Sequence, residues 1–346
     1  MGGYALAVTP GALLITPMLM RQPPKYVLGL LLGFFIVGNV LSAGAPNYGV
    51  MLLGRIITAL AHGGYFGIGA VLAAALVPAS KSASAVATMF AGLTIANVLG
   101  VPLGAFIGQH YGWRVVFVLI SVVGVMALVG LLVFVPVTEP EPQQLPITHQ
   151  FRTLVRPQVV LSIATTALVF GGMFGVFTYI EPLLRDVTDY PPQAIPWLLI
   201  LFGIGLFAGN IIGGRLADRN PDNAVLTLSL LLPIVILALS AAAAHQIPMA
   251  ILIFLLGLVG FATVPDLQAR VLRSAQGAAT LASAANIAAF NLGNALGVSI
   301  AGATIAAGWG LRSPSFTGTA LTLLGLTLVC LSRTKLFDAP TRNHNS

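Results

Sequence analysis

The stretch that decides the fold is Gly214-Arg215-Leu216-Ala217-Asp218-Arg219-Asn220-Pro221, a charged turn between two long apolar runs. A related turn lies 198 residues earlier, where Arg21 and Pro23 stand at the positions of Arg219 and Pro221. Further on, Asn97-Val98-Leu99-Gly100-Val101 is matched 197 residues later by Asn294-Ala295-Leu296-Gly297-Val298. Two parallel repeats related by an axis along the membrane normal are an architecture of membrane transporters. The sequence therefore predicts two related halves.

The composition excludes a soluble domain. Only 7% of the residues are charged, 57% are hydrophobic and the mean hydropathy is +0.96, whereas soluble domains carry roughly 25% charged residues. The net charge of +7 is spread over short loops and does not form one basic face, so we expect no nucleic-acid partner. A single cysteine, Cys330, excludes an internal disulfide and a cysteine metal cluster. We expect no metal and no cofactor.

A spanning helix needs about 20 mostly apolar residues. Eleven segments qualify, and the sequence predicts an all-α integral membrane protein with helices at 2–20, 26–44, 49–77, 83–107, 115–136, 158–184, 195–214, 224–243, 248–265, 277–307 and 316–332. The predicted organisation is an N-terminal bundle (1–136), a cytoplasmic linker (137–157), a C-terminal bundle (158–336) and a cytoplasmic tail (337–346).

The repeat offset also predicts a helix before the first residue. The second half begins near Gln158, so the offset of 198 residues places its counterpart about 40 residues before Met1. We therefore expect this chain to lack the first helix of the first half, through a misassigned start or a truncated gene.

Lys and Arg collect in cytoplasmic loops, and they predict the orientation. Three lie on one side of the predicted membrane, at Arg114, Arg185 and Arg312. Twelve lie on the other side, at Arg21, Lys25, Lys81, Arg152, Arg156, Arg215, Arg219, Arg270, Arg273, Arg333, Lys335 and Arg342. This bias predicts an inner or plasma membrane protein with Met1 outside and the C-terminus in the cytoplasm.

The repeated turn is a candidate latch on the cytoplasmic side. Gly214 allows close helix approach, and Asp218 can accept hydrogen bonds from the start of the next helix or pair with an arginine such as Arg219. In the first copy only the cations Arg21 and Lys25 remain. An ordinary solvated turn is the alternative interpretation.

Arg55 lies inside a predicted span, where a charge usually faces a cavity or a partner. His62 follows seven residues later and shares nearly the same helix face. Histidine titrates at about pH 6.5 when unperturbed, so the pair is a candidate for proton coupling. Glu181, near the outer end of its helix, is a further candidate. The alternatives are snorkelling of Arg55, a structural hydrogen bond for His62 and a water-exposed helix end for Glu181.

The helix at 83–107 carries Gly92, Asn97, Gly100, Pro102 and Gly104. Small residues at intervals of four allow close helix approach, and Pro102 is expected to bend the helix. This pattern predicts a helix that rocks against its neighbour, although plain tight packing would also explain it.

Other polar and aromatic residues complete the set of candidates. Asp266 is expected to pair with Arg270 at the cytoplasmic end of its helix. A midplane cavity is expected to be lined by Tyr65, Phe66, Phe174, Phe177, Tyr179 and Asn294.

At these residues the chain resembles the major facilitator superfamily, in particular its twelve-helix drug:proton antiporter branch, and it is similar to bacterial arabinose and chloramphenicol efflux permeases. The turn from Gly214 to Arg219 looks like that family's loop motif between helices eight and nine. Leu53 to Gly63 looks like its fourth-helix Arg motif, and Gly92 to Gly104 looks like its fifth-helix antiporter motif. The resemblance implies that Arg55 takes part in proton coupling, Asp218 and Arg219 in the latch, and Gly100, Pro102 and Gly104 in the antiport helix. It further implies that the two bundles contain family helices 2–6 and 7–12.

These observations predict a secondary active transporter that exports a small molecule in exchange for protons, by alternating access in the lipid bilayer and as a monomer. A facilitator of sugar or nucleoside export without protons, and a truncated protein that does not transport, are the alternatives. No phosphate-binding loop or catalytic motif occurs, so we expect no enzyme activity.

Overall fold

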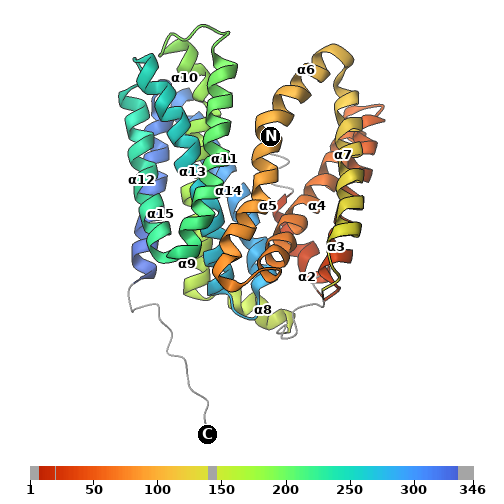
Figure 1. Ribbon diagram of the computed structural model, residues 1–346. Helices are drawn as coiled ribbons and strands as arrows, with labels where there is room; N and C mark the ends of the chain where they lie inside the picture. Colours follow the sequence, from red (N-terminus) through yellow and green to blue (C-terminus); the bar gives the residue numbers. More distant parts are fainter. Residues whose placement is uncertain (1–7, 20, 139–145, 334–346) are drawn as a thin grey trace.

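The structure is a computed structural model that describes residues 8–19, 21–138 and 146–333. The side chains of Asn97, Val101, Pro102, Ala105 and Ile147 are outside the description. The predicted tail (337–346) and the middle of the predicted linker (139–145) also lie outside the described residues. Within the described ranges, every regular element is a helix (Figure 1).

The first half contains five helical spans or part-spans. Its elements are η1 (Gly11–Ile15), α2 (Thr16–Leu19), α3 (Pro24–Ala43), α4 (Tyr48–Ala75), η2 (Ala79–Lys81), α5 (Ser82–Ile95), η3 (Ala96–Gly100), α6 (Val101–Tyr111) and α7 (Trp113–Phe134). The short helix α8 (Ile147–Leu154) then leads into the second half. That half consists of α9 (Pro157–Thr178), α10 (Ile180–Asp186), α11 (Ile195–Arg219), α12 (Pro221–Ala241), α13 (Gln246–Ser274), α14 (Ala279–Ala306) and α15 (Ser313–Ser332).

Ten helices in the described residues are long and apolar enough to cross a membrane, by length and composition. They correspond to ten of the eleven predicted segments. The other segment, 2–20, is described from Val8 to Leu19 as a shorter apolar helix, and its remaining residues lie outside the description. The all-α prediction is confirmed.

Two predicted helices are interrupted. The segment predicted at 83–107 contains the π-helical turn η3 between α5 and α6, and the segment predicted at 158–184 breaks at Tyr179 between α9 and α10. Pro102 is the second residue of α6, which continues directly from η3 with Gly100 still in a helical backbone conformation, and the bend expected at this proline stays a prediction. The irregular backbone comes just before it, in η3.

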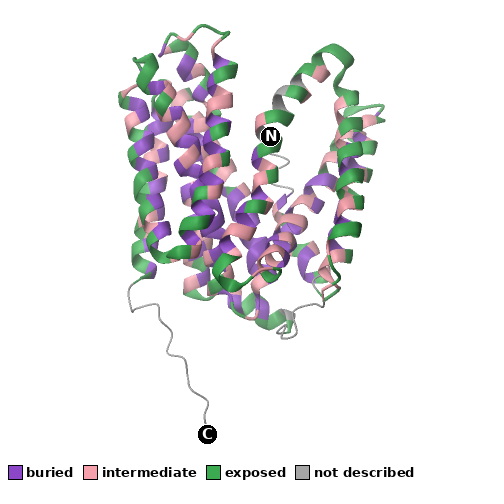
Figure 2. Cartoon of the chain, viewed as in Figure 1, coloured by how far each residue is buried: buried purple, intermediate pink, exposed green. Residues whose placement is uncertain are grey.

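Figure 1 shows two groups of helices that converge near α8 and diverge toward α6 and α10. The groups meet where α5 packs on α11 and α13, and where α4 packs on α14. The second half holds most of the large, fully buried side chains, including Phe261, Met173 and Leu256. By contrast α7, with a mean hydropathy of 3.0, is largely exposed (Figure 2), as expected for a helix that faces lipid.

Glycines explain the close packing of the second half. On α11, a Cβ added to Gly205 or Gly209 would overlap the carbonyl oxygens of Phe254 and Leu258 on α13. On α9, a Cβ added to Gly171 would overlap the backbone of Gly293 on α14. Small residues at intervals of four bring membrane helices into backbone contact, and here they hold α11 on α13 and α9 on α14.

Candidate functional site

A cavity of about 190 Å³ lies between the two halves. Its walls come from α4 and α5 on one side and from α9, α13 and α14 on the other. The cavity is mainly aromatic, and its lining residues are His62, Phe66, Phe90, Leu93, Phe170, Phe174, Phe261, Val264, Ile287, Phe290, Asn291 and Asn294. An apolar pocket with a few converging polar groups is the usual form of a small-molecule site.

Three polar side chains interrupt the aromatic wall: His62, Asn291 and Asn294. The Asn291 Nδ2 atom donates to the Ile287 carbonyl oxygen at 2.9 Å. The His62 ring lies 4.8 Å from the Phe66 ring, centroid to centroid. The cavity therefore presents one imidazole and two carboxamides to a bound molecule.

The structure places half of the predicted cavity residues in the wall and half elsewhere. Phe66, Phe174 and Asn294 line the cavity. Tyr65 packs in the apolar cluster of α3 and α4, and Phe177 stacks on the buried Phe202 ring with centroids 4.0 Å apart. The Tyr179 hydroxyl donates to the Val298 carbonyl at 3.4 Å, so this break between α9 and α10 is tied to α14. The prediction that these three line the cavity is wrong, because each already packs against its own half.

Of the two predicted coupling residues on α4, His62 lines the cavity and Arg55 does not. His62 is in the wall, whereas the Arg55 guanidinium lies over the Phe117 ring of α7 at 5.6 Å from the centroid. Arg55 and His62 are two helical turns apart on α4. The two side chains therefore lie on one face of α4, with Arg55 beside α7 and His62 at the cavity.

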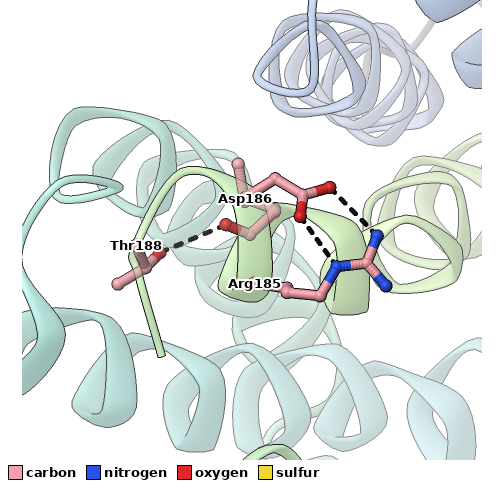
Figure 3. Close-up of polar contacts among 4 residues, drawn as sticks. Arg185, Asp186 and Thr188 are labelled. Carbon is pink, nitrogen blue, oxygen red and sulfur yellow. Dashed lines mark hydrogen bonds and ion pairs between the residues drawn. The ribbon is translucent and has the colours of Figure 1, made fainter. Parts of the chain in front are cut away.

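Glu181 does not reach the cavity. It is exposed on α10, beside the ion pair in which Arg185 Nε meets Asp186 Oδ1 at 2.7 Å and Arg185 Nη2 meets Asp186 Oδ2 at 3.1 Å (Figure 3). Just after the C-terminal end of this short helix, the Thr188 hydroxyl donates to the Leu183 carbonyl at 3.3 Å. Glu181 therefore lies among exposed charges on α10, after the break at Tyr179.

Asp218 connects the two halves directly. One carboxylate oxygen accepts from the backbone N–H of Ala83 at 2.9 Å and the other from that of Ser84 at 3.1 Å. These N–H groups open α5, so the carboxylate also meets the positive end of the helix dipole. The sequence suggested the start of the next helix as the donor, but Asn220 caps that helix by accepting from the Asn223 N–H. Asp218 instead accepts its hydrogen bonds from α5 in the other half.

The other residues of the turn take different positions. Gly214 is buried, and a Cβ there would lie 2.7 Å from the Ala87 Cβ of α5, so it belongs to the same contact. Arg219 and Arg21 are exposed. Lys25 donates to the Leu132 carbonyl of α7 at 2.8 Å, inside its own half. Of the turn residues, Asp218 and Gly214 therefore meet α5, together with Ala217, which lies in one buried cluster with Ala83.

A second contact between the halves is buried. The Ser283 hydroxyl of α14 donates to the Gly67 carbonyl of α4 at 2.7 Å. Behind it, Gln268 Nε2 donates to Ser283 Oγ at 2.6 Å, and Asn286 Nδ2 donates to Gln268 Oε1 at 2.8 Å. All three side chains are fully buried. Buried polar networks of this kind fix one arrangement of the helices.

The predicted pair between Asp266 and Arg270 does not form. Both Asp266 carboxylate oxygens are buried without a hydrogen-bond partner among the described residues. Arg270 instead donates to the hydroxyls of Ser162 on α9, at 3.3 Å, and Ser332 on α15. The i+4 spacing was correct, but the guanidinium is drawn to hydroxyls on neighbouring helices.

The glycines of α5 and α6 are not in close contact in this conformation. A Cβ on Gly92 or Gly100 would meet nothing within 4 Å, and one on Gly104 would meet only Val116 Cγ1, at 3.7 Å. The expected groove for close helix approach is therefore unfilled here. The side chains of Asn97 and Pro102 lie outside the description.

Comparison with known proteins agrees with this architecture. The family model described as Major Facilitator Superfamily matches residues 1–298, and in a second match residues 182–345. This chain belongs to the Major Facilitator Superfamily. It is accordingly a multi-pass membrane transporter of small molecules and not an enzyme.

Two curated relatives of this superfamily member are similar over nearly its whole length. "Inner membrane transport protein YdhP" of Escherichia coli K12 is 42% identical over 336 residues, covering 96% of this chain and 85% of the relative. "Chloramphenicol resistance protein" of Streptomyces lividans is 32% identical over 340 residues, covering 97% and 86%. The crystal structure of the E. coli fucose:proton symporter FucP superposes with a TM-score of 0.78 at 14% identity, covering 96% of this chain and 88% of that one. That likeness concerns the fold.

Sequence reasoning missed several residues that join the halves of this transporter. Ser283 and Gln268 were not singled out, nor was Asn210, whose Nδ2 donates to the Ala87 carbonyl of α5. The available signal was the presence of buried amides and hydroxyls in apolar helices, which are costly unless hydrogen-bonded. The partners across the two halves could not be read from one sequence, because Gly67 lies 216 residues from Ser283 and Ala87 lies 123 residues from Asn210.

Gly67→Ala is expected to force α4 and α14 of this transporter apart. The added Cβ would lie 2.8 Å from Ala284 Cα and 2.9 Å from Ala284 Cβ, with backbone on one side that cannot yield. We expect faster hydrogen–deuterium exchange in residues 62–72 of α4 and 279–290 of α14 in the variant. Gly69→Ala is the matched control, since its Cβ meets only the flexible Met89 sulfur, at 3.2 Å. Equal exchange in both variants would contradict this role of Gly67.

Proposed function

We propose that this chain exports a small molecule in exchange for protons by alternating access. In this proposal the bundles at 1–136 and 158–336, joined by the linker at 137–157, rock about the cavity between them. The observation that carries the proposal is the Asp218 carboxylate, which accepts two N–H groups from the other half. A contact that closes one end of the cavity is what one state of a two-state rocking transporter requires.

The charge bias supports an orientation. The twelve Lys and Arg residues listed above lie on the side of the linker, and such residues favour the cytoplasm. With the linker side inside the cell, the Asp218 contact closes the inner end, and the helices diverge toward the outside (Figure 1). The described conformation is then the outward-facing one, with the C-terminus in the cytoplasm.

The direction of transport follows from a relative. The Streptomyces lividans protein is named for resistance to chloramphenicol. A membrane transporter protects a cell from a compound by moving it outward. We extend this direction to the present chain.

For proton coupling we assign His62 as the proton carrier and Arg55 as the charge that tunes it, and we assign no coupling role to Glu181. His62 is the titratable side chain in the described cavity wall, so a substrate and a proton can compete for one space. Competition of this kind links the two fluxes, because binding of one ligand favours release of the other.

Inverted membrane vesicles with an acidic lumen test this assignment. We expect accumulation of radiolabelled chloramphenicol that depends on the pH gradient, as protons leave the lumen and the compound enters. His62→Gln keeps a hydrogen-bonding side chain but cannot carry the proton, so we expect it to lose roughly 90% or more of the gradient-driven uptake, in line with the typical value of a positioned acid–base group. Uptake that ignores the gradient in the unmodified protein would reject coupling.

Facilitated export without protons is the second candidate. The observation that favours it is the cavity lining, which contains no carboxylate among the described residues. Counterflow distinguishes the two candidates. A facilitator exchanges internal for external compound at equal rates whether or not the vesicle lumen is acidic, and it leaves the pH of a weakly buffered medium unchanged.

A further inference from the structure

The cavity is walled by aromatic rings from both halves. Phe66 of α4 stacks on Phe90 of α5 with centroids 5.6 Å apart. Across from them, Phe170 of α9 lies 4.5 Å from Phe174 and meets Phe290 of α14 edge-on at 4.8 Å. Phenyl rings bind another flat ring by offset stacking or by edge-to-face contact. A planar molecule can therefore stack on one half and meet ring edges of the other.

One edge of the cavity supplies hydrogen bonds. Asn291 and Asn294 are three residues apart on α14, which places them on one helix face. The Asn291 Nδ2 is occupied by the Ile287 carbonyl, so its Oδ1 remains as an acceptor. Asn294 is half-buried and its carboxamide forms no hydrogen bond with another described residue, so it retains both a donor and an acceptor. Carboxamides recognise the adjacent donor and acceptor on the edge of a heteroaromatic ring.

The charge of the cavity disfavours cations. Its described lining contains no carboxylate. A cation that entered would lose its hydration without gaining a counter-charge. Phenyl faces attract cations, but that attraction does not replace a lost hydration shell.

The size of the cavity in this conformation favours a small ring system. Pockets for drug-sized molecules enclose roughly 300–1,000 Å³, whereas this one encloses about 190 Å³. One ring or two fused rings fill such a volume.

We propose that the cavity binds an uncharged, flat heteroaromatic molecule of one or two fused rings that carries an N–H donor beside an acceptor, and that it excludes permanent cations. This inference rests on the proposed function, because it assigns the chemical class of the transported molecule to the same cavity.

Three ligands of equal ring size test the proposal: 2-quinolone, N-methyl-2-quinolone and N-methylquinolinium. The first is neutral with an N–H beside a carbonyl, the second lacks the donor and the third is a cation. Equilibrium dialysis with the purified full chain measures the dissociation constants. We expect 2-quinolone to bind roughly tenfold more tightly than its N-methyl form, the value of one hydrogen bond that leaves a buried group unpaired when lost. We expect the cation to bind most weakly.

Variants of Asn294 locate the effect. Asn294→Leu is expected to bring the affinities of the two quinolones within about twofold of each other, while Asn223→Leu, at an exposed position of α12, leaves the tenfold difference intact. Asn294→Asp supplies a counter-charge and is expected to reverse the order in favour of N-methylquinolinium, a gain that a misfolded protein cannot show. Preference of the unmodified protein for the cation, binding of none of the three, or an unchanged ratio in Asn294→Leu would each overturn the proposal.

The result of the binding experiment can be distinguished from the result of the transport experiment that tests the proposed function. Dialysis involves no membrane and no gradient, so the selectivity persists if proton coupling fails. Conversely, gradient-driven chloramphenicol uptake without the quinolone selectivity would leave the exporter in place and remove only the assigned ligand class.

Discussion

Asp218→Ala is expected to release α5 from α11 and to shift the protein toward the conformation that is open on the linker side. The variant loses two hydrogen bonds to a charged acceptor, each worth about 1.5–3 kcal/mol. It also loses the favourable position of the carboxylate at a helix N-terminus. Since water replaces part of this contact, a net loss of about 2 kcal/mol corresponds to a shift of roughly 30-fold in the conformational equilibrium.

Spin labels measure this shift. Labels at Gln109 and Gln193, which are exposed at the diverging ends of the two halves, report the outer separation in a Cys330→Ser background. We expect the Asp218→Ala distance distribution to move to shorter values, and transport to fall. Asp222→Ala is the matched control, because this exposed carboxylate on α12 does not reach the other half. A distribution that matches the control would show that Asp218 does not hold the halves together.

Gly209→Ala is expected to destabilise the second half without touching the cavity. Its Cβ would overlap the Leu258 carbonyl of α13, and the backbone on both sides is helical, so α11 and α13 must separate. Overpacking typically costs about 1–3 kcal/mol, and we expect the upper end because the obstacle is backbone. The apparent melting temperature of the detergent-solubilised protein measures the loss.

Gly33→Ala on α3 gives the comparison. An added Cβ there meets nothing within 4 Å, and alanine is the better helix former by about 1 kcal/mol. This variant is expected to melt at or above the temperature of the unmodified protein. If Gly209→Ala did so as well, the close contact between α11 and α13 would not be a source of stability.

The sequence was sufficient for the architecture because hydrocarbon imposes a strict condition. Backbone polar groups must be paired within each span, so apolar length alone located the helices. Breaks were harder to predict. Residues 96–100 contain no sequence pattern that predicts the π-helical turn. Tyrosine also occurs commonly inside helices, so Tyr179 does not predict a break. Both interruptions therefore depend on packing against other helices.

For the candidate site, the type of each residue predicted its chemical role, but the sequence did not predict which residues lie next to it in the fold. Asp218 was identified as a hydrogen-bond acceptor, but its donors are the backbone N–H groups of Ala83 and Ser84, which lie 135 and 134 residues away. Phe174 and Phe177 have the same chemistry and lie three positions apart, yet one lines the cavity and the other stacks on Phe202. The glycines of α11 were more decisive for packing than those of α5, a difference set by which helix lies opposite.

Two of the contacts between the halves, that of Asp218 with α5 and that of Ser283 with α4, differ in their access to water. We therefore expect them to break one after the other when the halves separate. Asp218 is half-buried at the end of α11, where dissolved ions screen charges over about 8 Å at physiological salt. Ser283, Gln268 and Asn286 are dry and uncharged, so salt leaves them unaffected. Rising ionic strength should therefore weaken the Asp218 contact at the first residues of α5 before the buried Asn210–Ala87 and Ser283–Gly67 hydrogen bonds, so the linker-side end of α5 should separate before α4 leaves α14.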